Sequence, residues 1–138
     1  MDETTKSTHN AVIHFLQAVE ARNVDDVVMS FTEQAEYQNV PYESHIGRDA
    51  IRALFAPILT RSTRVQWEIV SEVYVPGRAH LERIDRFWID GSEYSVPCHG
   101  VIHVDQDSGL ISEFFDYLDL GLWRESVKSV LTPRSPAQ

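Results

Sequence analysis

From residue 65 onward, hydrophobic residues recur with a period of two, and this pattern constrains the fold more than any other feature of the chain. Four long runs alternate in this way, and residues that favour turns separate them. Alternating runs bounded by such turns predict an antiparallel meander of long strands. The predicted strands are residues 65–75, 78–89, 94–104 and 110–118.

Three helices are predicted before the meander, because apolar residues in that part of the chain recur at helical spacing. Ser7 or Thr8 is positioned to cap the first helix, and Asn23 or Asp25 to begin a short second helix. Gly47 leads into a third helix. The meander thus follows a helical segment, which is the order of elements found in α+β proteins.

Residues 31–40 are predicted to form an edge or connecting strand, which Pro41 ends because proline cannot donate to a ladder. A last helix is predicted over residues 120–130. The fold class is therefore α+β, with N-terminal helices packed in a strongly curved, mainly antiparallel mixed sheet. A sheet of that shape forms a cone with a closed apolar pocket, which is the default place for a small-molecule site.

The length of 138 residues favours one domain, 1–138, with frayed ends at about residues 1–5 and 132–138. The formal net charge of -9 argues against nucleic acid as a partner, because a phosphate backbone is bound by clustered Lys and Arg side chains. No stretch reaches the roughly 20 apolar residues that a membrane span needs. We therefore expect neither nucleic acid nor a membrane as partner.

Cys98 is the only cysteine, so no internal disulfide is possible and a cytoplasmic location is expected. His99 follows it directly, but neighbours in a strand point to opposite faces. We interpret Cys98 as a small packing residue rather than a nucleophile. His99 and His103 share a strand face but lie roughly 13 Å apart, too far to chelate one metal ion. No metal and no other cofactor is expected, since no phosphate-binding glycine loop is present either.

Asp116 stands between aromatic and aliphatic residues in a strand that reads as apolar on both faces. A carboxylate there is costly unless a cation or hydrogen bonds hold it. Arg83 and Asp85 share a face of the 78–89 strand, and sheet curvature would let Arg83 bridge Asp85 and Asp116. Two carboxylates beside one arginine suggest one neutral acid and one ionised base. A purely structural ion pair is the alternative.

Tyr37 and Asn39 point to one face of the 31–40 segment. A phenol and a carboxamide at this spacing could position a water molecule by hydrogen bonds. Packing and turn roles are the alternative interpretation of the same two residues.

Segments around these residues resemble the limonene-1,2-epoxide hydrolases, in the same order and spacing across most of the chain. The resemblance is carried by Tyr37-Gln38-Asn39-Val40-Pro41, Glu82-Arg83-Ile84-Asp85 and Asp116-Tyr117-Leu118-Asp119-Leu120. It implies the cone-shaped fold of the nuclear transport factor 2 type, usually as a homodimer. It also implies the opening of a small apolar, terpene-like epoxide to a vicinal diol in one step, without a cofactor or a covalent intermediate.

By this resemblance, Asp116 is the base that activates a catalytic water, which Tyr37 and Asn39 hold. Asp85 is the acid that protonates the epoxide oxygen, and Arg83 links the two acids. Where the family often has Trp-Arg, this chain has Phe114-Phe115, which implies a different pocket wall. The residues expected to line the pocket are Phe87, Leu118, Phe114, Leu16 and Val19.

Two other functions remain open for this fold, because one fold type hosts many activities. A ketosteroid-isomerase-like or polyketide-cyclase-like enzyme would also use Asp116 as a base, with neutral donors for an enolate. A non-catalytic ligand-binding dimer is the third possibility.

Overall fold

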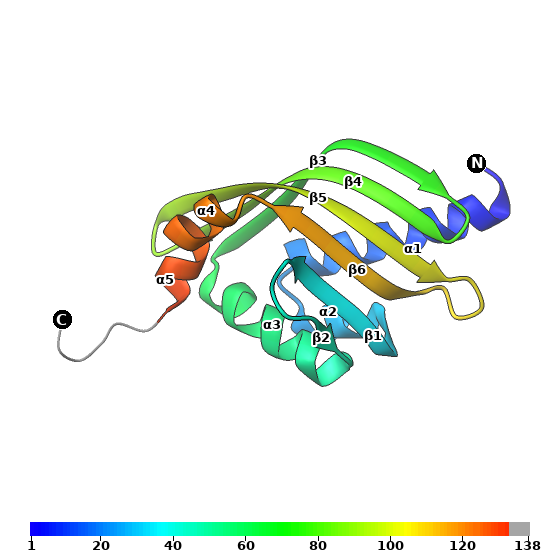
Figure 1. Ribbon diagram of the computed structural model, residues 1–138, viewed down its shortest axis with the longest axis horizontal. Coiled ribbons are helices and arrows are strands. Elements are labelled where there is room, and N and C mark those ends of the chain that lie inside the picture. The colour runs from blue at the N-terminus through cyan, green and yellow to red at the C-terminus, as the bar shows by residue number, and fades with distance from the viewer. Residues whose placement is uncertain (133–138) are drawn as a thin grey trace.

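A computed structural model describes residues 1–132 of the chain and contains one six-stranded mixed sheet (Figure 1). The strands are β1 (Phe31–Val40), β2 (His45–Ile46), β3 (Arg64–Val75), β4 (Arg78–Ile89), β5 (Ser92–Asp105) and β6 (Leu110–Leu118). They lie in the order β2-β1-β6-β5-β4-β3, and the sheet does not close into a barrel. All neighbours are antiparallel except β1 and β6, which run parallel.

The predicted meander is confirmed, and the bounds of β4 and β6 are those expected from the sequence. Glycines in left-handed backbone make the tight turns, with φ of 77° at Gly77 and 81° at Gly91. At the turn before β5, Asp90 also has a positive φ of 52°, and a turn with two such residues matches the twist of the strands that it joins. The predicted pairing of β6 with β5, and of β5 with β4, is also confirmed.

The helices before the meander lie on one side of the sheet, which curves over them in Figure 1. They are α1 (Glu3–Glu20), α2 (Val24–Met29) and α3 (Arg48–Arg61). Helix α1 packs chiefly on β3 and buries Val12, Phe15 and Val19 along one face. The predicted α+β class and the curved mixed sheet are therefore confirmed.

The N-terminus of α1 differs from the prediction. Asp2 caps the helix, accepting a hydrogen bond from the backbone N of Thr5 at 2.8 Å, so residues 3–5 are helical rather than frayed. Thr8 is instead buried inside the helix, where its hydroxyl accepts from the backbone N of Gly77. Asn23 caps α2, one of the two alternatives expected.

Residues 31–40 form a strand, β1, with the predicted bounds, but the prediction that it lies at an edge of the sheet is wrong. Strand β1 lies between β2 and β6, and its parallel pairing with β6 joins two segments far apart in the sequence.

Strand β6 also differs from the prediction, because only one of its faces packs against apolar side chains. Phe114 and Asp116 are buried, but Tyr117 is exposed on the outer face.

The C-terminal segment forms a helical run that is not a regular α-helix throughout. It consists of α4 (Leu120–Trp123), a π-helical turn (Arg124–Lys128) and α5 (Ser129–Leu131). The expected helix over residues 120–130 is thus present with an inserted π turn. Of the expected frayed end, residues 133–138 lie outside the described residues. Among the described helices, none combines the length and apolar character needed to cross a bilayer.

Candidate active site

Arg83 lies between Asp85 and Asp116 and donates hydrogen bonds to both. Its Nε and Nη2 donate to Asp85 Oδ1 and Oδ2, each at 3.0 Å, and Nη2 also donates to both carboxylate oxygens of Asp116 at 3.0 Å. The three residues are buried, with exposed fractions of 0% for Arg83, 7% for Asp85 and 3% for Asp116. In such surroundings, removing Arg83 would leave the two buried carboxyl groups without a cation.

Gly100, which was not predicted from the sequence as a site residue, makes this arrangement possible. It pairs with Asp116 on β6, and the side chain of Arg83 passes close to it. A Cβ atom at this position would lie 2.5 Å from Arg83 Nη1 and 2.8 Å from Asp116 Oδ1. An interior strand glycine often marks a close approach, so the sequence did contain a signal.

The parallel pair β1·β6 brings Tyr37 and Asn39 to the acids. Tyr37 Oη donates to Asp116 Oδ2 at 2.6 Å, and Asn39 lies opposite Asp116 in the strand register. The predicted common face of Tyr37 and Asn39 therefore meets Asp116. The phenol oxygen and the carboxamide remain available as acceptor and donor for a further polar molecule.

Aromatic rings surround the guanidinium group. The Cζ atom of Arg83 lies 4.6 Å from the ring centroid of Trp67 and 5.6 Å from that of Phe114. Phe114 also stacks on Tyr37, with ring centroids 4.7 Å apart. These rings exclude water from the ion cluster and fix the plane in which Arg83 donates.

Burial changes the proton affinities of the cluster. It raises the pKa of Asp85 above its ordinary value, against the opposing effect of Arg83, whose charge favours the ionised carboxylate. Burial, reinforced by the negative charge of Asp116, also raises the pKa of Tyr37 well above its usual range. Burial disfavours the charge of Arg83, but Asp116 and Asp85 outweigh it and raise the guanidinium pKa further. The site thus combines a permanent cation with an acid inclined to keep its proton.

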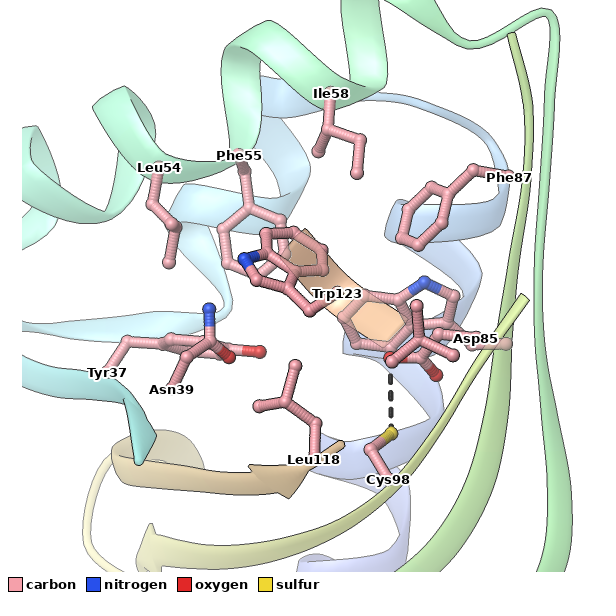
Figure 2. Close-up of a pocket in the computed structure, with 12 residues that line it drawn as sticks. Tyr37, Asn39, Leu54, Phe55, Ile58, Asp85, Phe87, Cys98, Leu118 and Trp123 are labelled. Carbon is pink, nitrogen blue, oxygen red and sulfur yellow. Dashed lines mark hydrogen bonds between the residues drawn. The ribbon is translucent and has the colours of Figure 1, made fainter. Parts of the chain in front are cut away.

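A cavity of about 480 Å³, including its mouth, opens beside Asp85 (Figure 2). Of the pocket residues predicted from sequence, Phe87 and Leu118 line it, as do Tyr37, Asn39 and Asp85. Its walls are otherwise mainly apolar and include residues that were not predicted from the sequence: Leu54, Phe55, Ile58, Trp67, Val96, Cys98 and Trp123. Most of them come from α3, β3 and the C-terminal helical run, whose approach to the cavity depends on tertiary packing.

The other three expected pocket residues lie elsewhere. Phe114 is fully buried beneath Tyr37 and Arg83, while Leu16 and Val19 pack in the core between α1 and the sheet. Their prediction as lining residues is wrong because the cavity opens nearer α3 than α1. Asp116 is also absent from the lining, but Tyr37, which lines the cavity, donates a hydrogen bond to it.

Cys98 has a more specific place than the packing role assigned from sequence. Its Sγ donates to Asp85 Oδ2 at 3.3 Å, and burial raises the pKa of the thiol (Figure 2). A thiol that keeps its proton is a donor rather than a nucleophile. Cys98 therefore supplies Asp85 with a further hydrogen bond.

The histidines lie away from this site. His80 and His99 approach each other, Nδ1 to Nε2, at 3.4 Å. Within residues 1–132, no group of three His, Cys, Asp or Glu side chains is arranged to hold a metal ion.

Comparison with known proteins places the chain in a family. Residues 12–114 match the SnoaL-like domain. Among solved structures, a putative SnoaL-like polyketide cyclase from Shewanella denitrificans superposes with a TM-score of 0.77 at 10% identity, over 88% of this chain and 97% of that one. A putative polyketide cyclase from Xanthomonas campestris superposes with a TM-score of 0.77 at 17% identity, over 91% of this chain and 99% of that one. Both likenesses concern the fold.

A third structure is more similar in sequence. An LEH-like epoxide hydrolase from M. tuberculosis superposes with a TM-score of 0.70 at 26% identity, over 91% of this chain and 96% of that one. The predicted nuclear transport factor 2-like fold is confirmed by the family match together with the curved sheet. Since that match spans most of its length, the chain belongs to the SnoaL-like domain family.

Proposed function

We propose that the protein is an epoxide hydrolase that adds water to an apolar epoxide and yields a vicinal diol. One observation carries the proposal: two buried carboxylates share the guanidinium of Arg83, and one of them, Asp85, faces an apolar cavity. Epoxide opening needs a base on water and an acid on the leaving oxygen at the same time. Each group typically contributes about 10²–10⁴-fold to the rate.

In the proposed reaction, Asp116 takes a proton from a water molecule held by Tyr37 and Asn39. The water oxygen forms a bond to an epoxide carbon, the bond from that carbon to the ring oxygen breaks, and Asp85 gives its proton to that oxygen. Tyr37 already donates to Asp116 at 2.6 Å, so the phenol oxygen is free to accept from the water. No covalent intermediate and no cofactor takes part.

The charge balance supports this division of roles. Before the reaction, Arg83 is positive, Asp116 negative and Asp85 neutral, and afterwards the two acids have exchanged charge states. The net charge of the cluster is zero in both states, so the reaction leaves no uncompensated charge in this buried site. Because Arg83 Nη2 contacts both carboxylates, the cation touches the ionised acid before and after turnover.

The cavity wall indicates the kind of substrate. Leu54, Phe55, Ile58, Phe87 and Leu118 offer aliphatic and aromatic surface and no charge. A cyclic, terpene-like epoxide matches such walls, since apolar burial supplies the binding energy. The likeness to the M. tuberculosis epoxide hydrolase points in the same direction.

A cyclase or isomerase is the second candidate, because structures described as putative polyketide cyclases share the fold. Such an enzyme would use Asp116 to remove a proton next to a carbonyl and would need neutral donors for the enolate. The hydrogen bonds from Arg83 to both acids favour the hydrolase, because that reaction needs Asp116 to take up a proton while Asp85 gives one away. Isomerisation of an enone-forming ketone without any diol formation would decide for the second candidate.

The test is a screen for diol formation over cyclic and aromatic epoxides with three variants. Asp116→Asn and Asp85→Asn should each abolish turnover, while Asp107→Asn, the same change in an exposed turn, should not affect it. A single turnover in ¹⁸O-labelled water should place the label in the diol. Label found first in Asp116, or near-normal turnover by either active-site variant, would contradict the assigned roles.

A further inference from the structure

The indole N–H of Trp67 is buried and has no hydrogen-bond acceptor. Among side-chain nitrogen and oxygen atoms of the described residues, only Trp67 Nε1 and Arg83 Nη1 are buried without a partner. Arg83 donates four hydrogen bonds through its other nitrogens, whereas the indole has a single donor. An unmet buried donor costs about 1–3 kcal/mol, so its retention calls for an explanation.

Trp67 stands beside the proposed acid. It is directly opposite Asp85 in the register of β3 and β4, so both side chains project from the same face of the sheet. Both also line the cavity. The proposed acid and an unused N–H donor thus come from neighbouring strands to one wall of the same cavity.

The other neighbours of the indole are unsuited as acceptors. One side faces the guanidinium of Arg83, and the ring meets Phe15 and Phe87 in edge contacts with centroids 5.8 and 6.3 Å apart. Trp67 itself is only 5% exposed. An acceptor for this N–H is therefore most simply supplied by a molecule that enters the cavity.

We propose that Trp67 Nε1–H donates a hydrogen bond to an oxygen of the substrate. This inference rests on the proposed function, in which this oxygen is the epoxide oxygen that Asp85 protonates. As the carbon–oxygen bond breaks, that oxygen gains negative charge, and a donor fixed in a water-poor site stabilises it more than the intact epoxide. Trp67 is then a catalytic residue that lowers the barrier, and the indole gains its missing acceptor only when substrate is bound.

Trp67→Phe tests the catalytic role. Phenylalanine keeps an aromatic ring at the position and removes the N–H. We expect kcat for epoxide opening to fall about 10- to 100-fold with little change in KM, because the lost bond forms mainly in the transition state. Trp88→Phe, a ring change outside the cavity, should leave both constants unchanged. An unchanged kcat, or a rise in KM alone, would overturn the catalytic role.

A second measurement does not depend on turnover. The three tryptophans give three indole ¹⁵N–H resonances, and Trp67→Phe identifies the one from Trp67. If that variant does not fold, Trp88→Phe and Trp123→Phe identify it by elimination. Titration with tetrahydropyran, an inert cyclic ether, should move this resonance downfield, whereas cyclohexane, which lacks the oxygen, should not.

The outcomes separate this inference from the proposed function. Equal responses to the ether and the hydrocarbon would overturn the donor role of Trp67, even if the wild type forms diols. A downfield shift with the ether alone would support the donor role. That shift in a protein that opens no epoxide would overturn the hydrolase assignment while leaving Trp67 as the donor to an oxygenated ligand.

Discussion

Gly100 is the residue on which the buried ion cluster depends most directly. Gly100→Ala would place a methyl group 2.5 Å from Arg83 Nη1 and 2.8 Å from Asp116 Oδ1. We expect the Arg83–Asp116 contact to open, with a loss of about 3–5 kcal/mol in the free energy of unfolding, the usual cost of breaking a buried pair. Diol formation should fall with it. Urea denaturation and an activity assay measure the two effects, and a variant as stable as the wild type would refute the steric argument.

Asp85 should impose an alkaline limit on activity. Burial raises its pKa above the ordinary 3.8, and the proposed mechanism uses its protonated form. The rate should therefore fall as the pH rises through an apparent pKa above 3.8, which belongs to the Asp85–Asp116 pair. A kcat–pH profile measures it, and activity that rises through that range would contradict the acid role.

The free energy of unfolding should also depend on the proton of Asp85. A raised folded-state pKa means that the folded protein holds the proton of Asp85 more tightly than the unfolded chain. This contribution to the free energy of unfolding is complete below pH 3.8 and is lost as the pH rises through the folded value. Wild type should thus lose stability relative to Asp85→Asn across that interval.

Cys98→Val, which removes a hydrogen bond to the ionised form of Asp85, should move the alkaline limit of activity to higher pH.

At the scale of elements, β1 contributes the hydroxyl group of Tyr37 and the carboxamide of Asn39. Tyr37→Phe removes the hydrogen bond to Asp116 and the acceptor proposed for water. We expect kcat to fall by about 10²-fold, within the range of general acid–base effects, while the ring still stacks on Phe114. Steady-state kinetics and circular dichroism together check this. Tyr74→Phe, which changes a phenol bonded to Glu72 outside the cavity, is the matched control.

The elements differ in how far the sequence predicts them. Strands β4 and β6 follow from local pattern, because alternation and glycine turns fix their bounds. The bridge from Arg83 to both acids also follows, since the order of consecutive strands places Asp116 two strands away from Arg83. The parallel partner of β1 does not follow, because strand pairing across most of the chain leaves no local signal.

The cavity was harder to predict than the ion cluster for a similar reason. Leu16 and Val19 have the spacing of a buried helix face, and periodicity does not distinguish a core face from a cavity wall. Trp123 reaches the cavity through the C-terminal helical run, whose position depends on packing. Trp67 has the alternation of an ordinary inward-facing strand residue, and only coordinates reveal that its N–H lacks a partner.

At the scale of the whole molecule, the homodimer expected from the family resemblance stays a prediction. The sheet has exposed apolar side chains, with exposed fractions of 53% for Val70, 61% for Val73 and 52% for Tyr117. Apolar groups of this kind are candidates for burial against a second copy. Sedimentation should give twice the chain mass of 15.8 kDa, and Val73→Asp should shift the equilibrium toward single chains. A wild-type mass of one chain at all concentrations would rule this out.

The parallel pairing of β1 with β6 has a consequence for protein synthesis. Tyr37 leaves the ribosome early, but its partner Asp116 is 79 residues further along the chain. The N-terminal helices and the first hairpin of the meander can form while translation continues, whereas Asp116 and Tyr37 meet only after β6 has emerged. A nascent chain would therefore contain much of its secondary structure before it contains any active site.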